Sequence, residues 1–367
     1  MPMANVNVKV NVKVSVLASL QSLLQAGGSL EADQVAEAVT ALVEESVSSE
    51  TKADFLIALA DKGETPEEIA AFANELRTRA IEVPVDEATR DRGIVDIVGT
   101  GGDKVGTFNI STGAALLVSA AGVPVAKHGN RAITSPTGSA DVLEALGIRV
   151  DSSPEEAAAS LRDLGFVFLF APRFHPAFKH IAPARKLCAE RGKRTLFNLL
   201  GPLLNPARPS AQLMGVPEPR WCEPMALALR ALGVDSAMVV CGTAQGASGL
   251  LHFDEISSVG PTFAAVARPG EPLRTMEILP ADLGVDQACL ADLIGGDRTT
   301  NARLIERLLA NEERGPKRDA VRLNAAAALW TAGKALSIRG GLKLVDDALD
   351  SGAANLKLKS LATRIPA

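Results

Sequence analysis

Residues 94–112 have the order expected of an anion-binding turn. A mostly β-branched run, 94–98, leads into a loop with three glycines, and an apolar helical pattern begins near Asn109; the glycines are Gly99, Gly101 and Gly102. Glycines let a backbone approach a phosphate closely, and a helix N-terminus offers free N–H groups and the positive end of its dipole. The carboxylate of Asp103 in the same loop indicates a further ligand group, such as a ribose hydroxyl or a hydrated metal.

The glycine loop fits neither of two common phosphate-binding motifs. The dinucleotide fingerprint requires glycine where this chain has Lys104, and the P-loop requires lysine where it has Thr107. A glycine-rich turn that binds no ligand therefore stays open as an alternative for this segment taken alone.

A second polar cluster follows the next candidate strand. Lys127 and Arg131 offer cationic donors, and Ser139 stands at the start of a helical pattern. Ligands of open α/β sheets bind beyond the carboxyl ends of the strands, so we expect the loops 99–107 and 127–135 to face one crevice. The alternative is that the two cations are only solvated charges and that Ser139 is only a helix N-cap.

Acidic and basic side chains farther along the chain add to the candidate chemistry. Asp254 and Glu255 are adjacent, and magnesium is usually held by one or two carboxylates together with substrate phosphates. The basic segment 173–194 favours an anionic ligand, and Arg185 lies four residues after Ile181, on the same side of a helix. The histidines show neither metal-ligand spacing nor the order of a Ser-His-Asp triad.

Two kinds of secondary structure must position these groups. Residues 16–80 show only helical spacing, with a helix start at Thr65, whereas strands and helices alternate from residue 93. The predicted strands are 94–98, 123–127, 166–170 and 237–241, and the predicted helices are 110–120, 139–146, 155–164, 176–190, 222–232, 299–311 and 318–333. This alternation predicts an α/β fold, a mainly parallel sheet flanked by helices, after a small all-helical domain.

The composition argues against several classes of protein. A length of 367 residues allows two domains and a large core. The net charge of −5, the 4% aromatic content and the lack of tyrosine argue against a nucleic-acid-binding protein. Four widely spaced cysteines fit reduced thiols in a cytoplasm. The uncharged run 105–126 predicts a buried helix and strand rather than a membrane span, and residues 1–15 predict a short strand or a disordered lead.

Several separated strings can be compared with known families. They are Gly99-Thr100-Gly101-Gly102-Asp103, Asn109-Ile110-Ser111-Thr112, Lys127-His128-Gly129-Asn130-Arg131, Gly138-Ser139-Ala140-Asp141, His175-Pro176, Phe197-Asn198, Gly201-Pro202-Leu203-Leu204-Asn205-Pro206 and Asp254-Glu255. In this order, over roughly residues 16–355, they resemble the anthranilate phosphoribosyltransferases of tryptophan biosynthesis. Each string alone is weakly specific, whereas the set is highly specific.

The resemblance implies a fold and an activity. It implies a tail at 1–15, a helical domain at 16–88 and an α/β domain of the nucleoside-phosphorylase type at 89–367, with helix 176–190 packing with the helical domain. The family forms homodimers through its N-terminal helices. It transfers the 5-phosphoribosyl group from phosphoribosyl diphosphate to the amine of anthranilate, with Mg²⁺, and releases diphosphate. Neither nucleic acid nor membrane is an expected partner, and the expected location is the cytoplasm.

The resemblance also implies roles for individual residues. Phosphoribosyl diphosphate would be held by Gly99, Gly102, Asp103, Thr107, Asn109, Ile110, Ser111, Thr112, Lys127, His128, Gly129, Asn130, Arg131, Ala132, Ile133, Thr134, Ser135 and Ser139. Magnesium would be held by Ser111, Asp254 and Glu255, and anthranilate by Gly99, Asn130 and Arg185. The expected catalytic residues are Lys127, Asn130, Arg131 and Arg185, which would stabilise the leaving diphosphate or orient the anthranilate carboxylate.

The chain departs from the family pattern in the tail Asn5–Val14, which has no counterpart there, and in the loop before the acidic pair, and two rival functions stay open. The acidic pair of the family usually follows Gly-Leu or Gly-Met, whereas here His252 and Phe253 intervene, so the loop is longer and bulkier. A pyrimidine nucleoside phosphorylase would share the fold but would give no reason for the acidic pair. A non-catalytic relative that binds nucleic acid through a basic face is the other alternative.

Overall fold

The computed structural model describes residues 3–101, 105–132, 137–246, 249–286 and 288–362, with side chains described from Lys13 onward. The chain divides into two compact units. The helical unit comprises the chain up to Ile81 together with Phe174–Leu204, and the α/β unit comprises Glu82–Arg173 and the chain from Asn205 onward. The domain boundaries at 15/16 and 88/89 stay predictions.

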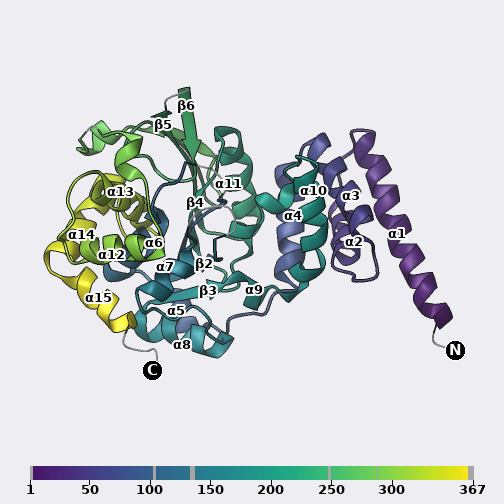
Figure 1. Cartoon of the computed structure of the whole chain (residues 1–367), viewed down its shortest axis with the longest axis horizontal. Helices are drawn as coiled ribbons and strands as arrows, with labels where there is room; N and C mark the ends of the chain where they lie inside the picture. The colour runs from purple at the N-terminus through teal and green to yellow at the C-terminus, as the bar shows by residue number, and fades with distance from the viewer. Residues whose placement is uncertain (1–2, 102–104, 133–136, 247–248, 287, 363–367) are drawn as a thin grey trace. The chain divides into compact units, whose positions relative to one another are not determined.

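The helical unit is built from short amphipathic helices. Its α-helices are α1 (Met3–Gln25), α2 (Ala32–Leu42), α3 (Ser49–Lys62), α4 (Pro66–Arg77) and α10 (Ala182–Glu190), and its 3₁₀ turns are η1 (Pro176–His180), η2 (Leu196–Asn198) and η3 (Gly201–Leu204) (Figure 1). The predicted helix start is confirmed, because the Thr65 hydroxyl accepts from Glu68 N and the Glu68 carboxylate accepts from Thr65 N. Leu17, Leu20 and Leu24 of α1 are buried in this unit.

The structure differs from the expectation for the N-terminal segment. The alternation of Val with Asn or Lys predicted a short strand or a disordered lead, but α1 begins at Met3. Once the buried leucines of 17–24 fix a helix, each further residue adds a hydrogen bond at the cost of fixing only one more residue. Propagation from this anchored half therefore overrides the β-propensity of the valines.

The segment 174–204 is held to α3 by polar contacts. Lys52 Nζ donates to Glu44 O at 2.7 Å and to His180 O at 2.9 Å, and Lys52 is 2% exposed. Cys188 Sγ donates to Ala53 O. A buried ammonium requires such acceptors, so these bonds fix where the segment lies within the helical unit.

Within the described residues, the α/β unit contains one eight-stranded sheet of order β3-β2-β1-β4-β5-β7-β8, with β6 paired to β5. The strands are β1 (Val95–Gly99), β2 (Val125–Gly129), β3 (Phe166–Phe170), β4 (Ala211–Gly215), β5 (Ser236–Gly246), β6 (Gly249–Phe253), β7 (Thr262–Ala267) and β8 (Arg274–Ile278). In this order, β3, β2, β1, β4 and β5 pair in parallel. Strands β6 and β7 each pair antiparallel with β5, and β8 pairs antiparallel with β7. Residues Gly99 and Gly215 are register partners at the carboxyl ends of β1 and β4.

Helices cover both faces of this sheet (Figure 1). They are α5 (Glu87–Asp91), α6 (Ile110–Ala120), α7 (Ser139–Ala145), α8 (Pro154–Leu164), α9 (Ala171–Phe174, whose last residue belongs to the helical unit), α11 (Cys222–Ala231), α12 (Arg298–Leu309), α13 (Pro316–Thr331), α14 (Ile338–Asp350) and α15 (Ala353–Ala362). Short 3₁₀ turns lie at η4 (Pro219–Trp221), η5 (Pro280–Leu283) and η6 (Leu290–Leu293). Helices α6 and α13 pack on each other and on β1, β2, β4 and β5, and α11 packs on β5 and β7.

Helix α6 is almost entirely buried, as the uncharged run 105–126 predicted. Gly113 in it packs closely on α13, because a Cβ at that glycine would stand 3.1 Å from Val321. In the described part of the chain, no helix has the length and apolar character needed to cross a membrane.

Candidate functional site

The acidic pair meets the glycine loop and the start of α6. Asp254 Oδ2 accepts from Gly101 N at 2.7 Å, and Glu255 Oε1 accepts from Ser111 N at 3.0 Å. Backbone N–H groups at a helix N-terminus lack intrahelical partners and attract negative charge, which explains the second bond. The structure thus brings the acidic pair, 144 to 153 residues later in the chain, to the glycine loop and the start of α6, at the carboxyl ends of β1 and β4.

Three glycines make room for the turn that carries Asp254 and Glu255, which we call the acidic turn. A Cβ at Gly99 would stand 2.3 Å from Asp254 Oδ2, one at Gly215 would stand 1.6 Å from Asp254 O, and one at Gly242 would stand 2.4 Å from Glu255 O. These glycines belong to the neighbouring strands β1, β4 and β5, so the turn lies directly against the strand backbones. Sequence analysis missed Gly215 and Gly242, because an isolated glycine at the end of a strand carries no signal of what packs on it.

The longer loop before the acidic pair forms a hairpin. Its residues make β6, which pairs with β5 from Gly249 to Phe253, with Phe253 opposite Gly242. His252 and Phe253, the additional residues that distinguish this loop from the family pattern, are therefore strand residues. The hairpin ends immediately before Asp254, so the departure from the family pattern does not separate the acidic pair from the glycine loop.

The first residues of α6 differ in what their side chains do. Asn109 precedes the helix, and its side chain donates to Thr137 O at 3.3 Å and accepts from Asn301 Nδ2 at 3.0 Å. The side chains of Ile110 and Thr112 are buried in the core. Any contact of Ile110 with a phosphate would therefore come from its backbone.

Lys127 is a buried residue of β2 next to this site, and not an exposed residue of the loop that follows the strand. It is 1% exposed, and its Nζ donates to Ile97 O at 2.6 Å and to Ser111 Oγ at 3.3 Å. Burial lowers the pKa of Lys127, and the charges of Asp96, Glu255 and Asp254 oppose that shift. The Lys127 side chain thus lies buried next to the acidic pair and is not a solvated surface charge.

A buried carboxylate that sequence analysis missed supports the second loop. Asp96 is fully buried, and it accepts from Asn205 Nδ2 at 2.8 Å and from His128 N at 3.3 Å. Asn205 Nδ2 also donates to Ala126 O at 2.7 Å. Burial raises the pKa of Asp96 to about 6, against the effect of Lys127. An acid within the apolar run 94–98 was the available signal, since charged groups are rarely buried without partners.

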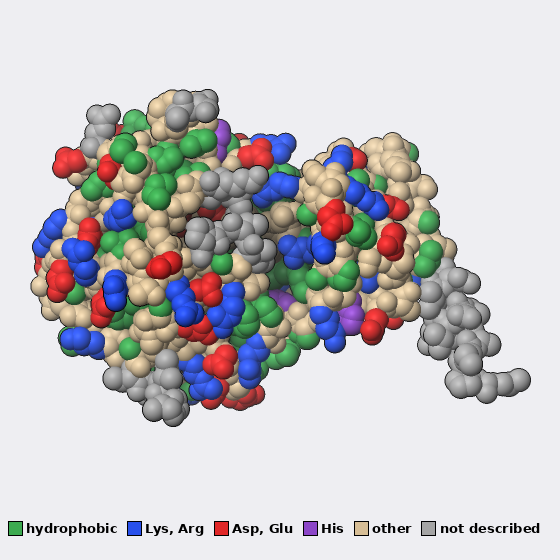
Figure 2. Space-filling model, viewed as in Figure 1, with side chains coloured by type: hydrophobic (Ala, Val, Ile, Leu, Met, Phe, Trp, Pro, Cys, Tyr) green, Lys and Arg blue, Asp and Glu red, His purple; other side chains and the backbone are tan. Residues whose placement is uncertain are grey.

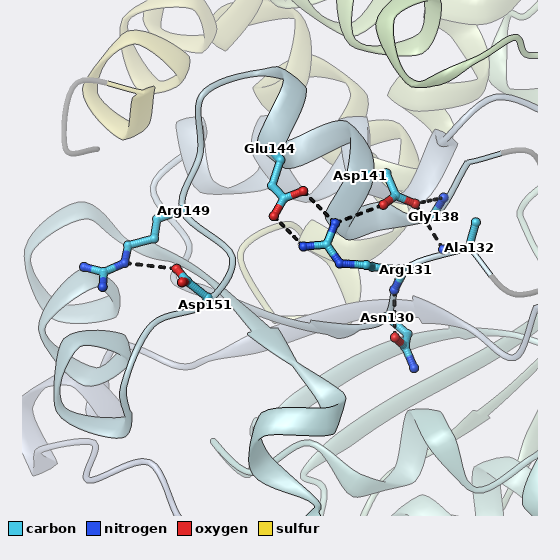
Figure 3. Close-up of polar contacts among 8 residues, drawn as sticks. All are labelled: Asn130, Arg131, Ala132, Gly138, Asp141, Glu144, Arg149 and Asp151. Atoms are coloured by element: carbon cyan, nitrogen blue, oxygen red, sulfur yellow. Dashed lines mark hydrogen bonds and ion pairs between the residues drawn. The ribbon is translucent and has the colours of Figure 1, made fainter. Parts of the chain in front are cut away.

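Arg131 is engaged in ion pairs in this structure (Figure 3). Its guanidinium donates to both carboxylate oxygens of Glu144, at 2.6 and 2.5 Å, and to Asp141 at 3.2 Å. It also lies 5.6 Å from the ring centroid of Phe170, and the bonds with Glu144 raise its pKa. The side chain is 45% exposed, so Arg131 would have to exchange these exposed partners in order to bind a phosphate.

The loop around Arg131 is closed by α7. Asp141 Oδ2 accepts from Ala132 N at 3.0 Å and from Gly138 N at 2.9 Å, and the Asn130 side chain accepts from Arg131 N (Figure 3). Gly138 is the N-cap and Ser139 is the first residue of the helix, so the alternative that made Ser139 the N-cap is wrong. The reason is that the Asp141 carboxylate caps the helix from its third position, which leaves no need for a side chain at the cap.

The other residues of the expected phosphoribosyl diphosphate site are placed as follows. Thr107 pairs with Ile294 in an isolated bridge, and His128 and Gly129 end β2. Gly102, Asp103, Ile133, Thr134 and Ser135 lie outside the described residues.

Arg185, the residue expected to meet anthranilate together with Gly99 and Asn130, belongs to the helical unit, whereas the other two belong to the α/β unit. It is half-buried on α10, and its guanidinium carbon lies 5.9 Å from the ring centroid of Phe197. Burial lowers the pKa of Arg185. Among the described residues, no carboxylate lies within ion-pairing distance of it. A half-buried cation of this kind favours an external carboxylate.

The surroundings of Arg185 are aromatic. Phe178 makes edge-to-face contacts with both His175 and Phe197, with ring centroids 5.7 Å apart in each pair. Burial lowers the pKa of His175 to about 4, so this imidazole is neutral at pH 7. Phe178 therefore links the segments His175-Pro176 and Phe197-Asn198 of the resemblance within the helical unit, and Arg185 lies over Phe197.

The acidic pair fits magnesium by its chemistry. Ser111, Asp254 and Glu255 are hard oxygen donors, which magnesium prefers. Among the described residues, no group of three or more His, Cys, Asp or Glu side chains that could by itself hold a metal ion is found. Two carboxylates and a hydroxyl suit an ion that keeps several waters and takes further oxygens from substrate phosphates.

Comparisons with known proteins point to one family. The family model described as the glycosyl transferase family a/b domain matches residues 91–355, and the model for the helical bundle domain of that family matches residues 19–80. The chain is 45% identical over 338 residues to an anthranilate phosphoribosyltransferase of Parvibaculum lavamentivorans, covering 92% of this chain and 94% of that protein. It is 50% identical over 311 residues to one of Solibacter usitatus, covering 84% and 87%.

Solved structures show the same relationship. Anthranilate phosphoribosyltransferase from Thermus thermophilus superimposes with a TM-score of 0.83 at 43% identity, covering 94% of this chain and 98% of that chain. The enzyme from Saccharomyces cerevisiae, solved in complex with phosphoribosyl diphosphate and Mg, gives 0.81 at 25% identity, covering 96% and 99%. This chain belongs to the anthranilate phosphoribosyltransferase family.

Proposed function

We propose that this protein transfers the 5-phosphoribosyl group of phosphoribosyl diphosphate to the amine of anthranilate, giving N-(5-phosphoribosyl)anthranilate and diphosphate in tryptophan biosynthesis. The observation that carries the proposal is the contact of Asp254 and Glu255 with the glycine loop and the start of α6. This arrangement places carboxylates for a metal beside backbone donors for phosphates, which a sugar with phosphates at both ends requires.

The chemistry needs positioning and charge more than a strong base. The aryl amine of anthranilate is neutral and nucleophilic at pH 7, and the difficult step is loss of diphosphate from C1′ as positive charge develops on the ribose. Magnesium held by Ser111, Asp254 and Glu255 would neutralise charge on the diphosphate. Lys127 Nζ lies beside Ser111, next to that site, where an ammonium would offset negative charge on the leaving diphosphate.

Two arginines have distinct proposed roles. Arg131 stabilises the leaving diphosphate after exchanging Glu144 and Asp141 for phosphate oxygens. Arg185 orients the anthranilate carboxylate by a charge-assisted pair, which its half-buried guanidinium favours. Gly99 and Asn130 complete the anthranilate contacts, and the residues named for the phosphoribosyl diphosphate keep their proposed role.

The finer aspects of assembly are also part of the proposal. We infer a homodimer through the N-terminal helices, a cytoplasmic location and no nucleic-acid partner. Lys and Arg side chains are interspersed with Asp and Glu over the visible face of the α/β unit (Figure 2), which supports the last point because nucleic-acid binding needs a basic patch.

A substrate-omission assay tests the reaction. Anthranilate fluorescence should fall when phosphoribosyl diphosphate and MgCl₂ are both present, and it should persist when either one is omitted. Phosphorolysis of thymidine or uridine with inorganic phosphate is the matched assay for the phosphorylase alternative. Phosphorolysis without loss of anthranilate would replace the proposal with that alternative.

A further inference from the structure

A buried side-chain amide on helix α13 binds the backbone next to the acidic turn. Asn324 on α13 is 1% exposed, its Oδ1 accepts from Ile256 N at 2.9 Å, and its Nδ2 donates to Ile256 O at 3.0 Å. The Nδ2 also donates to Ala320 O at 2.9 Å, within the same helix. One side chain thus satisfies both backbone groups of the residue that directly follows Glu255.

The bond from Ile256 N fixes the peptide plane that joins Ile256 to Glu255, and the bond to Ile256 O fixes the next peptide plane. On the other side of the turn, Glu255 O lies close against Gly242, because a Cβ built there would stand 2.4 Å from that oxygen. The Glu255 carboxylate is held in turn by Ser111 N. The acidic turn therefore lies between strand backbones and a helix, with the Asn324 amide as its polar anchor on the helix side.

Helix α13 packs against both elements that meet in the bond between Glu255 and Ser111 N, namely the acidic turn and α6. Val321, three residues before Asn324, packs against Gly113 of α6, and α6 provides the N–H group that binds Glu255. A single helix thus sets the distance between the acidic turn and the start of α6.

From these contacts we propose that Asn324 is a positioning residue for the metal site: it holds Asp254 and Glu255 in the orientation that binds Mg²⁺. The inference rests on the proposed function of these two carboxylates. Groups that orient metal ligands typically change metal affinity by about 10–100-fold when they are removed. Asn324 touches neither substrate nor metal in this account, so its loss should weaken metal binding more than it alters substrate affinity at saturating metal.

The test measures metal binding without turnover. Mn²⁺ is titrated into the protein with phosphoribosyl diphosphate and no anthranilate, and free Mn²⁺ is followed by electron paramagnetic resonance. Asn324→Ala should weaken Mn²⁺ binding about 10–100-fold and leave the KM for phosphoribosyl diphosphate at saturating Mg²⁺ within about threefold of wild type. If that variant does not fold, Asn324→Asp replaces it, because it keeps the side-chain volume and the bond from Ile256 N while losing the donated bonds.

Thr331→Val is the matched control, since Thr331 is a buried hydroxyl on the same helix, bonded to Ala327 O and Met238 Sδ, away from the acidic turn. It should leave Mn²⁺ affinity unchanged. Unchanged Mn²⁺ affinity in the Asn324 variant, or equal weakening in Thr331→Val, would overturn the positioning role. An Asp254→Asn variant distinguishes failure of the proposed metal site from failure of the proposed role of Asn324. If Asp254→Asn also leaves Mn²⁺ affinity unchanged, the metal site itself is wrong. If Asp254→Asn weakens Mn²⁺ binding and the Asn324 variant does not, only the positioning role of Asn324 is wrong.

Discussion

The substitution Gly215→Ala should disable the site without touching any group that binds a ligand. A Cβ at Gly215 would stand 1.6 Å from Asp254 O and 2.3 Å from Asp254 C. Real Cβ atoms essentially never come within 3.0 Å of such atoms, so the acidic turn must retreat by at least the difference, about 1.4 Å. Both atoms at the clash belong to backbone, so no side-chain rotation relieves it.

The retreat should cost both activity and stability. The bond from Gly101 N to Asp254 Oδ2 is 2.7 Å long, and a shift of this size breaks it. Displacements of about 1 Å at a reacting centre cost on the order of 100-fold in rate. Overpacking of this kind also lowers the free energy of unfolding by about 1–3 kcal/mol.

The assay is the rate of anthranilate consumption as a function of MgCl₂, together with urea unfolding. Gly340→Ala is the control, because Gly340 lies exposed on α14 with its nearest neighbour 3.4 Å from a built Cβ. That change should raise the free energy of unfolding by about 0.5–1 kcal/mol and leave the rate unaltered. A Gly215→Ala enzyme with a rate and a magnesium requirement within twofold of wild type would refute the placement of the acidic turn.

Three further outcomes are expected. Arg185→Ala should raise KM for anthranilate far more than KM for phosphoribosyl diphosphate, and equal effects on both in steady-state kinetics would count against an anthranilate-binding role. Asp254→Asn should weaken the dependence of the rate on magnesium, and an unchanged titration would remove Asp254 from the metal site. Burial lowers the pKa of His175 from 6.5 to about 4, so between these pH values the imidazole is protonated in the unfolded state and neutral in the folded state. The free energy of unfolding is therefore unaffected by His175 above pH 6.5, and it falls by about 3 kcal/mol in total as pH falls toward 4. His175→Phe should therefore flatten the pH dependence of unfolding in this range; Asp96, whose pKa is raised to about 6, acts in the opposite sense in both proteins and cancels in the comparison.

The elements that sequence analysis identified are those with a strong apolar period. The helix predicted at 110–120 has those bounds in the structure, and the strand predicted at 166–170 is β3. By contrast, β4, β6, β7 and β8 were missed. In β4, Gln212 interrupts a short apolar run, and β8 alternates charged and apolar residues at an exposed edge. Such strands are defined by their neighbours in the sheet, which a single segment of sequence does not reveal.

Some members of the candidate site were predictable from the sequence, but Asp96, Gly215, Gly242 and the internal contacts were not. The glycine loop, Lys127 and the acidic pair were named from residue type and from the family resemblance. The burial of Lys127 was not foreseen, because a lysine at a strand end is ordinarily solvated. The role of Asn324 was not predictable either. It depends on a hydrogen bond with Ile256, which is 68 residues away in the chain, and an asparagine in an alanine-rich helix does not reveal such a partner.

A crystal of this protein grown with phosphoribosyl diphosphate and Mn²⁺ would test the central claim most directly. The anomalous signal of Mn²⁺ should lie within bonding distance of a carboxylate oxygen of Asp254 or Glu255, with phosphate oxygens facing the backbone of the glycine loop and the start of α6. A metal peak remote from both carboxylates, with the sugar phosphate bound elsewhere, would contradict it.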